Sequence, residues 1–457
     1  MFTHRLAAAG LLLAALLAAP LAQADELQQL KSEISEMRQA YEARLQALER
    51  RIAELQQAPA APPAAPPASP PAEAPSAAPA SASAFNPAIS LILNGAYANL
   101  SRDPASWHIQ GFIPSGGEVG PGLRSFQLGE SELGLAANID PSFSGHITFS
   151  LTGDDSVSVE EAVFERQGLF GGGSLKAGRF LSAIGYLNSQ HAHAWDFVDA
   201  PLAYQAFFGG PLKTDGLQLR WLAPTERFVE LGAELGSGAT FPGNDTGRNG
   251  VGSTALFAHV GDDIGDSASW RAGVSYLHHR AVDRSYEDVD STGTLRSNSF
   301  SGNSGTWVLD GIYKWAPGGN ATRQNLKVQG EYFRRTESGE LESAPASGDY
   351  RSTQSGWYLQ AVYQFMPMWR IGLRHDSLDS GSPRIGMVAS GALTAADLPI
   401  LQSYKPKRDT VMVDYSLSEF SRFRLQLAAD RSSPDGTDRQ LFLQYIMSLG
   451  AHGAHTF

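Results

Sequence analysis

The run Trp357-Tyr358-Leu359-Gln360-Ala361-Val362-Tyr363-Gln364-Phe365 decides the fold of this chain. Its apolar and small residues share one side of an extended backbone: Trp357, Leu359, Ala361, Tyr363 and Phe365. Polar atoms gather on the other side, at Tyr358, Gln360 and Gln364. Because successive side chains of a strand point to opposite faces, the run predicts a β-strand with one apolar face. An aromatic residue stands at each end of that face, as a strand crossing a bilayer between two interfaces requires.

Similar alternating runs recur along residues 85–457. The clearer ones are 89–97, 133–139, 147–151, 217–222, 229–233, 270–276, 307–315, 326–332, 369–373, 411–415, 423–429 and 441–449, with weaker ones near 157–165, 174–180 and 254–260. We therefore predict an all-β fold, a transmembrane antiparallel β-barrel of about sixteen strands, whose even number returns both ends to one side. A barrel of that size is too wide for side chains to fill, which predicts an aqueous channel. A soluble all-β protein also alternates and stays as the alternative fold.

The connections between these runs alternate in length. Short turns fall at 140–142, 171–173, 223–225, 317–319 and 366–368, and longer stretches at 101–124, 183–212, 237–250, 281–303, 336–353 and 377–404. Outer-membrane barrels have this asymmetry, with tight periplasmic turns and longer external loops. The chain also finishes on an alternating run in which Tyr445 and Phe457 share a face. This pattern resembles the signal read by the barrel-assembly machinery.

The first 84 residues differ from the rest in composition. Residues 1–24 have one arginine, an apolar run and small residues before Asp25, which predicts a secretory signal peptide rather than a retained anchor. Residues 25–57 place apolar residues at 3-4 spacing, which predicts a periplasmic coiled coil or, as the alternative, a single amphipathic helix. Residues 58–84 are almost entirely Pro, Ala and Ser and predict a stiff linker.

Composition narrows the function further. The 457 residues include no cysteine and carry a formal net charge of -12, which excludes a disulfide scaffold and disfavours a nucleic-acid-binding role. The mean hydropathy of -0.21 argues against a helical membrane protein. The sequence lacks a phosphate-binding loop, HExxH and G-x-S-x-G motifs, so we expect neither an enzyme nor a cofactor.

The polar faces of the runs give the expected pore lining. By parity, residues of both signs point inward, which predicts a transverse field rather than a funnel of one sign. The expected basic residues are Arg220, Arg271, Lys314, Lys327, Arg370, Arg374 and Arg424, and the acidic ones include Glu132, Glu230, Glu234, Asp310 and Glu331. As the alternative for any one of these residues, the side chain is only solvated and forms an ion pair with a residue of the neighbouring strand.

Residues 174–185, SLKAGRFLSAIG, precede the long stretch 183–212. They resemble a motif of the phosphate-selective porin O and P family, with Arg179 and Ala183 departing from its Gln and Pro. The resemblance implies a homotrimer of sixteen-stranded barrels in which the third long loop folds inward as a constriction. The mixed signs of the lumen charges leave phosphate specificity unsupported.

Residues 183–212, which would follow the fifth strand as the third external loop, carry the candidate binding residues. His191 and His193 lie on the same side of an extended backbone, and Asp196 or Asp199 could reach them. Together these residues offer nitrogen and oxygen ligands that suit a metal such as zinc. We also assign Trp195, Asp196, Asp199 and Tyr204 to the constriction. Residues 191–204, HAHAWDFVDAPLAY, and 442–457 resemble uncharacterised proteobacterial outer-membrane proteins, some labelled zinc-regulated receptors. TonB dependence is not expected, because the chain lacks a plug and the barrel is too short for about 22 strands.

The sequence therefore predicts an outer-membrane channel for small hydrophilic solutes, with its N-terminal segment in the periplasm. Two alternatives stay open: a transporter specific for zinc or a metal complex, and an envelope tether. The expected partners are outer-membrane lipid, two further copies of the chain, the assembly machinery and a periplasmic or cell-wall partner of the coiled coil.

Overall fold

The structure is a computed structural model that describes residues 87–450 except 117–118, 154, 170, 245–248 and 291. The expected signal peptide, coiled coil and linker lie outside the described residues, and so does Phe457. Within the described part of the chain, no helix is both long enough and apolar enough to cross a membrane.

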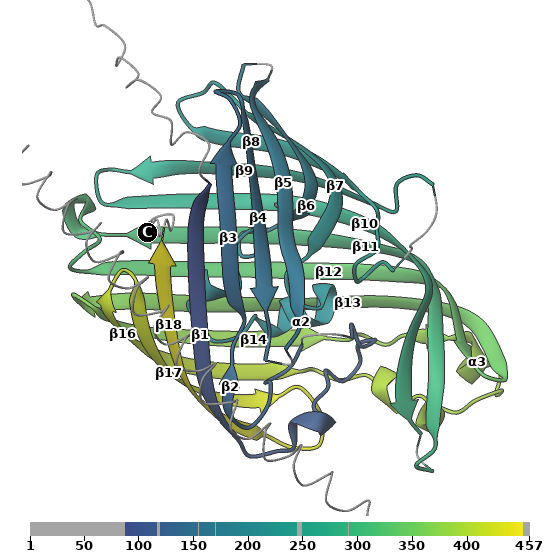
Figure 1. Cartoon of the computed structure of the whole chain (residues 1–457). Coiled ribbons are helices and arrows are strands. Elements are labelled where there is room, and N and C mark those ends of the chain that lie inside the picture. Colours follow the sequence, from purple (N-terminus) through teal and green to yellow (C-terminus); the bar gives the residue numbers. More distant parts are fainter. Residues whose placement is uncertain are drawn as a thin grey trace, which may run out of the picture. The chain divides into compact units, whose positions relative to one another are not determined.

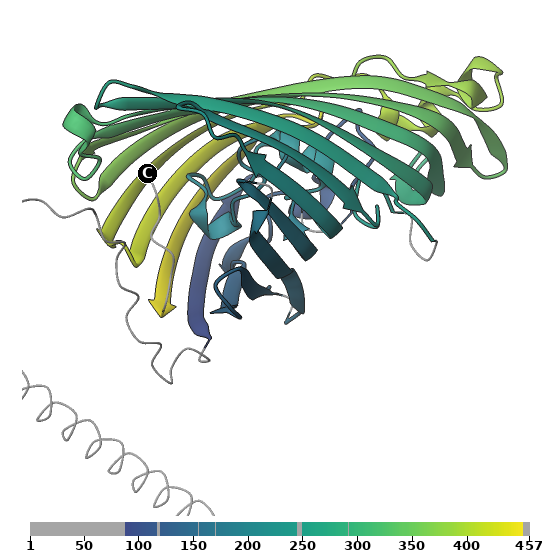
Figure 2. The ribbon, with the colours of Figure 1, turned by 90° about the horizontal axis from the view of Figure 1, so that it is seen from above.

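The described residues form one antiparallel sheet that closes on itself. Each strand pairs with its neighbours in sequence, and β1 also pairs with β18 from Ser90↔Gly450 to Leu100↔Gln440. Figure 1 shows these first and last strands side by side, and Figure 2 shows the sheet curving around an interior. The chain is therefore a closed β-barrel, as the alternating runs predicted.

The sheet has eighteen strand segments, but two of them do not count as separate strands of the barrel. β2 and β3 pair with successive parts of β1, and the two-residue β15 sits beside the end of β13 while β14 pairs directly with β16. The barrel therefore has sixteen strands in the described part of the chain, which confirms the predicted number. The bounds are β1 Ala88–Leu100, β2 Ser125–Leu128, β3 Ser131–Asn138, β4 Phe143–Leu151, β5 Val157–Leu169, β6 Gly173–Leu181, β7 Lys213–Leu222, β8 Phe228–Gly236, β9 Ser253–Ile264, β10 Ala268–Val289, β11 Leu295–Trp315, β12 Asn325–Ser343, β13 Ala346–Met366, β14 Trp369–Asp379, β15 Arg384–Ile385, β16 Lys407–Ser418, β17 Ser421–Arg431 and β18 Asp438–Gly450.

The outer face carries aromatic residues at two levels. One level holds Tyr276 opposite Trp307 and Tyr332 opposite Trp357, and the ring centroids of the first pair are 4.8 Å apart. The other level includes Trp369 opposite Tyr415 and Phe423 opposite Tyr445. Exposed leucines fill the outer face between the levels, among them Leu309, Leu359, Leu373 and Leu425. An apolar band between two aromatic rows is the outer surface that a bilayer requires.

Two segments that we expected to be loops are strands. Residues 281–303 lie mostly in the hairpin of β10 and β11, and residues 336–353 in the hairpin of β12 and β13. Here the alternation is inverted, because Phe300 and Leu341 are buried on the inner face while Thr336, Ser338 and Glu340 are exposed outside. The expectation was wrong because it required every strand to have an apolar outer face. These strands continue beyond the apolar band, and there their outer face is polar.

The longer connections carry short helices and form a second apolar core under the extended hairpins. Ile113, Met387 and Leu401 pack there against Phe300 and Tyr350. The helices are the 3-10 turns η1 Pro104–Ser106, η2 Ala192–Ala194, η3 Pro317–Gly319, η4 Ala395–Asp397 and η5 Pro399–Leu401, and the α-helices α2 Leu202–Phe208 and α3 Gly386–Ala389.

Candidate functional site

Residues 182–212, which connect β6 to β7, fold into the barrel and form what we call the constriction loop. This is the third connection on its side and follows the fifth barrel strand, as the sequence predicted. All seven residues of α2 in this loop are buried, and the helix ends at Gly209, whose left-handed backbone (φ 73°) suits glycine. Figures 1 and 2 show α2 inside the wall, and its contacts are with β12, β13 and β14.

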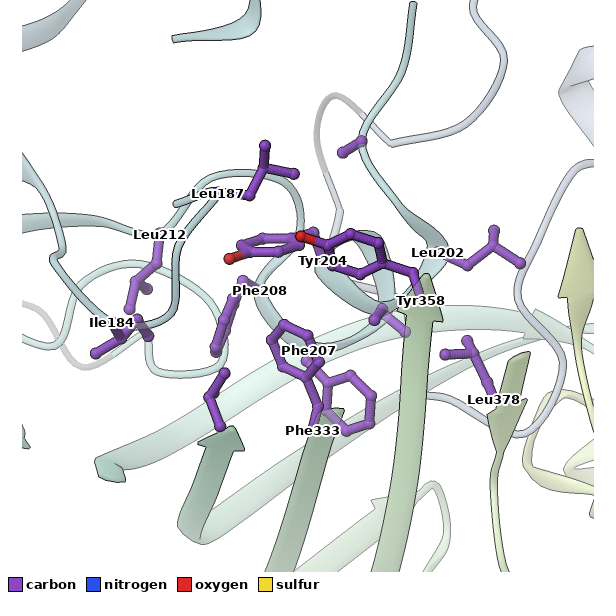
Figure 3. Close-up of a cluster of buried hydrophobic side chains, with 14 of the residues drawn as sticks. Ile184, Leu187, Leu202, Tyr204, Phe207, Phe208, Leu212, Phe333, Tyr358 and Leu378 are labelled. Carbon is purple, nitrogen blue, oxygen red and sulfur yellow. The ribbon is translucent and has the colours of Figure 1, made fainter. Parts of the chain in front are cut away.

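An aromatic core fixes α2 against the wall. The Phe207 ring stacks on Phe333 with centroids 5.6 Å apart, and Tyr204 and Phe208 meet the same ring edge-on. Figure 3 shows these rings converging with Tyr358. Such burial removes several large rings from water at one place, so the loop is held firmly rather than resting in the lumen.

Glu331 is not the solvated pore residue that we expected. It is 3% exposed and accepts hydrogen bonds from the Tyr204 hydroxyl (2.9 Å), the Tyr358 hydroxyl (2.7 Å) and the backbone N–H of Leu187 (2.9 Å). Because both of its oxygens accept from groups of the loop or the wall, Glu331 anchors the constriction loop.

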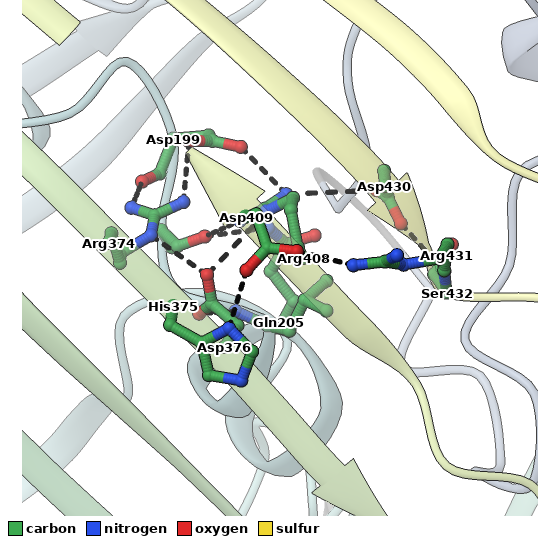
Figure 4. Close-up of polar contacts among 12 residues, drawn as sticks. Asp199, Gln205, Arg374, His375, Asp376, Arg408, Asp409, Asp430, Arg431 and Ser432 are labelled. Carbon is green, nitrogen blue, oxygen red and sulfur yellow. Dashed lines mark hydrogen bonds and ion pairs between the residues drawn. The ribbon is translucent and has the colours of Figure 1, made fainter. Parts of the chain in front are cut away.

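Asp196 and Asp199 attach the same loop to the basic side of the wall. Asp196 pairs with Lys327 and with Arg370 (3.2 Å), and Asp199 pairs with Arg374 (2.9 Å) and Arg408. Figure 4 shows Asp199 between its two guanidinium partners. The expectation that either aspartate joins the histidines is wrong, because Coulomb attraction draws both to these cations.

The basic partners also shift the acidity of the two aspartates. Burial alone would raise the pKa of Asp196, but the attraction of Lys327 and Arg370 outweighs it and holds the pKa below its usual value. Burial would raise the pKa of Asp199 as well, and Arg408 and Arg374 lower it on balance. Both carboxyls are therefore ionised at neutral pH.

His191 and His193 lie on the other side of the loop, against β3 and β5. The Nδ1 atom of His191 lies 3.2 Å from Glu132 Oε2 and 3.1 Å from Glu160 Oε2, and its Nε2 atom lies 3.0 Å from Glu161 Oε2. His193 contacts the other oxygen of Glu132 at 2.7 Å. Burial would lower the pKa of His191, but the carboxylates outweigh it and raise that pKa well above its ordinary value. The pocket therefore favours a positive charge.

A β-bulge brings two consecutive glutamates into this pocket. Thr148 of β4 pairs with Glu161, but the next residue, Phe149, pairs with Val159, so Glu160 is the extra residue of β5. In a regular strand Glu160 and Glu161 face opposite sides, whereas both are buried here. A bulge redirects side chains in this way, and strict parity cannot reveal it.

The remaining expected pore residues lie on the buried or half-buried inner face, mostly in ion pairs. Arg220 pairs with Glu230, Arg271 with Asp310 (3.2 Å), and Arg424 with Asp414 (2.7 Å). Glu234 instead accepts from Ser182 Oγ (2.6 Å) and the backbone N–H of Ala183 (2.8 Å) at the start of the constriction loop. Arg374 is buried under Asp199, while Lys314 and Trp195 are half-buried and buried, respectively.

Four contributing residues escaped the sequence analysis. Glu160 and Glu161 have a visible signal, because two adjacent acidic residues interrupt an alternating run. Arg408 and His146 have the right parity but lie just before the predicted runs 411–415 and 147–151, in parts of β16 and β4 that the alternation did not reveal. His146 Nε2 lies 3.3 Å from Glu161, and Arg408 donates to the backbone oxygen of Ala200 at 2.8 Å.

Solved structures of outer-membrane proteins are similar to this chain. The mutant OmpTdeltaL8 of OmpT, an outer membrane protein of Vibrio cholerae, superposes with a TM-score of 0.50 at 12% identity, covering 79% of this chain and 98% of that one. The outer membrane channel DcaP of Acinetobacter baumannii gives a TM-score of 0.45 at 12% identity, over 79% of this chain and 96% of that one. At such identities the likeness concerns the fold alone.

Sequence comparison gives a nearer relative. No family model matches the chain. An uncharacterized protein of Aquifex aeolicus (strain VF5) is 30% identical over 402 residues, which cover 82% of this chain and 80% of the relative. The chain therefore belongs to the same family as this Aquifex aeolicus protein.

Proposed function

We propose that this protein is an outer-membrane channel for small hydrophilic solutes. The observation that carries the proposal is the contrast between the two faces of the closed barrel. Outside, exposed leucines lie between two aromatic rows, while inside, charged residues of both signs cover the wall. A bilayer matches the first surface and water the second. The shared fold with an outer membrane protein of Vibrio cholerae supports the same location.

The constriction loop sets the width of the proposed channel. It binds to β3 and β5 through its histidines and to β12, β14 and β16 through its aspartates, so it extends between distant parts of the wall. A loop held at both sides narrows the lumen and keeps it narrow, which favours small solutes. Passage needs no catalysis, and we propose no enzymatic role.

The orientation and partners follow from the same proposal. We place the short turns and both ends of the barrel at the periplasmic side, where residues 25–57 would form the coiled coil and reach a periplasmic or cell-wall partner. The resemblance to phosphate-selective porins supports a homotrimer in outer-membrane lipid, built by the assembly machinery. Chemical cross-linking of the detergent-solubilised protein tests the trimer.

Conductance tests the channel. Purified, folded protein added to a planar bilayer is expected to insert in discrete current steps, and heat-denatured protein is the control. A barrel that is shown to be folded by circular dichroism, yet inserts without conducting, contradicts an open channel.

A second candidate function is a transporter specific for zinc or a metal complex. The grouping of Glu132, Glu160 and His191 favours it. Replacing His191 and His193 by alanine should then impair growth only under zinc limitation. The envelope tether depends on residues 25–84, and their deletion, scored by envelope integrity and solute flux, tests that prediction.

A further inference from the structure

We propose that Glu132, Glu160 and His191 form a binding site for a divalent metal ion of the zinc class, at the contact between the constriction loop and the wall. Glu132 comes from β3, Glu160 from the bulge of β5, and His191 from the loop. The proposal names the class of cation that would bind at the constriction. The metal site itself does not depend on the proposed channel, and only its role at a channel constriction rests on that function.

The spacing of the three ligand atoms suits such an ion. One atom from each residue lies within 4.8 Å of the others, and His191 Nδ1 lies 3.2 Å and 3.1 Å from the two carboxylate oxygens. Zinc bound tetrahedrally at about 2.0–2.2 Å has ligands roughly 3.4 Å apart. Binding therefore needs only small movements of these side chains.

One N–H of His191 is not enough for a full hydrogen bond to each of the two carboxylates. Nδ1 of an imidazole carries at most one hydrogen, yet two carboxylate oxygens contact it. The Glu160 side chain is 2% exposed and its contact with His191 is shared with Glu132. Two buried carboxylates at one nitrogen repel each other, and a divalent ion in place of the imidazole proton offsets both charges, whereas an imidazolium offsets one.

The surrounding charges separate this pocket from the other acidic residues of the lumen. Asp196, Asp199 and Asp414 each pair with two basic side chains. Among the described residues, Glu132, Glu160 and Glu161 form ion pairs with histidines alone. The pocket thus holds three carboxylates without an arginine or lysine partner among the described residues, unlike the three aspartates.

Further contacts orient the ligands as metal sites require. The other ring nitrogen of His191 meets Glu161, whose second oxygen accepts from the backbone N–H of Leu181 at 3.0 Å. His193 holds the free oxygen of Glu132. Histidine ligands generally donate their second N–H to a carboxylate in this way, which fixes the tautomer and the ring.

The donor set selects the metal. Imidazole suits zinc and similar borderline ions, whereas magnesium and calcium prefer oxygen ligands alone. Three protein ligands leave a fourth position for water or a solute. Zinc bound here would join the loop to β3 and β5 at its histidine side, complementing the ion pairs at its aspartate side.

Zinc binding to the purified full-length protein tests the site. Isothermal titration with zinc ion is expected to show one site per chain that magnesium ion does not fill. His191→Ala should abolish this binding, and Glu161→Gln should weaken it about 10- to 100-fold, as loss of an orienting carboxylate does. His259→Ala is the matched control, because His259 contacts Glu230 at 3.0 Å but Arg220 already pairs with that carboxylate.

The outcomes are distinct. Absence of zinc binding in the unaltered protein, equal binding by His191→Ala, or equal filling by magnesium would overturn the site. Glu160→Gln keeps the shape of the side chain and should also lose zinc affinity, which guards against a misfolded alanine variant. Planar-bilayer current is recorded on the same samples, so zinc binding without conductance rejects the channel and keeps the site, and conductance without zinc binding does the reverse.

Discussion

Asp199 lies between two guanidinium groups that have almost no contact with water. The side chains of Arg374 and Arg408 are each 1% exposed. Removing one member of a buried ion pair leaves the other charge without compensation, which is costlier than losing an exposed pair. This residue, together with Asp196, therefore attaches the constriction loop at its basic side.

We predict that Asp199→Asn lowers the free energy of unfolding by up to about 3–5 kcal/mol, because two buried cations lose one of the two anions that they share, the other being Asp376. Asp409→Asn is the control, since Asp409 is about half exposed in its pair with Arg431, and its loss should cost about 0–1 kcal/mol. Denaturant unfolding of the detergent-folded proteins measures both. Equal effects would show that burial does not strengthen the Asp199 contacts.

The depressed pKa values of Asp196 and Asp199 make loop attachment dependent on pH. A carboxyl whose folded pKa is lowered stabilises the fold above its unfolded pKa of about 3.9, and that stability is lost as pH falls through the folded value. We expect single-channel current to stay steady from pH 7 to about pH 5 and to become noisy only well below about pH 4. Asp199→Asn should already be noisy at neutral pH, and a wild-type transition near neutral pH would contradict this account.

At the scale of elements, the constriction loop depends on one close approach. Gly185 has a left-handed backbone (φ 67°), and a Cβ added there would lie 2.3 Å from Glu331 Oε2 and 3.0 Å from the Tyr204 hydroxyl. Glycine is therefore required where the loop passes its anchor.

We predict that Gly185→Ala displaces the loop and destabilises the protein by more than about 1 kcal/mol, through backbone strain and the clash with Glu331. Gly311→Ala in β11 is the control, because nothing lies within 4 Å of the added Cβ and its backbone is extended. Protease sensitivity of the loop and the unfolding midpoint report both variants. Equal sensitivity would mean that the approach to Glu331 is unimportant.

The elements also show which parts of the structure the sequence predicts. Alternation revealed the strands of the apolar band because their outer faces follow one rule. The same rule failed for residues 281–303 and 336–353, where the polar face turns outward. It also failed at Glu160, because a bulge depends on the register with β4 and not on the run itself. Contacts of His191 with Glu132 join residues far apart in sequence, which no local pattern contains.

At the scale of the whole molecule, the exposed charge of the lumen differs in sign from the net charge of the chain. In three of the wall ion pairs the basic member is the more exposed one, as with Arg220 at 39% against Glu230 at 8%. Arg271 and Arg370 are likewise more exposed than their buried aspartate partners. At these pairs a solute of the proposed channel would meet more positive than negative surface, although the chain as a whole carries a formal net charge of -12.

We predict that chloride permeates more readily than potassium. Reversal potentials in a potassium chloride gradient measure the preference, which Arg220→Gln should reduce. Arg227→Gln is the control, because Arg227 lies in the turn between β7 and β8 and is 73% exposed. A preference for potassium in the unaltered protein would refute the positive lumen.

The pairing of β1 with β18 has a consequence for the assembly of the newly made chain. A chain that lacks β18 leaves two open sheet edges, on β1 and β17, and open edges recruit other strands. Closure thus acts as a length check, since only a chain that supplies both terminal strands satisfies every edge. Incomplete products expose the hydrogen-bonding groups that seal the finished barrel, so we expect them to associate with other chains.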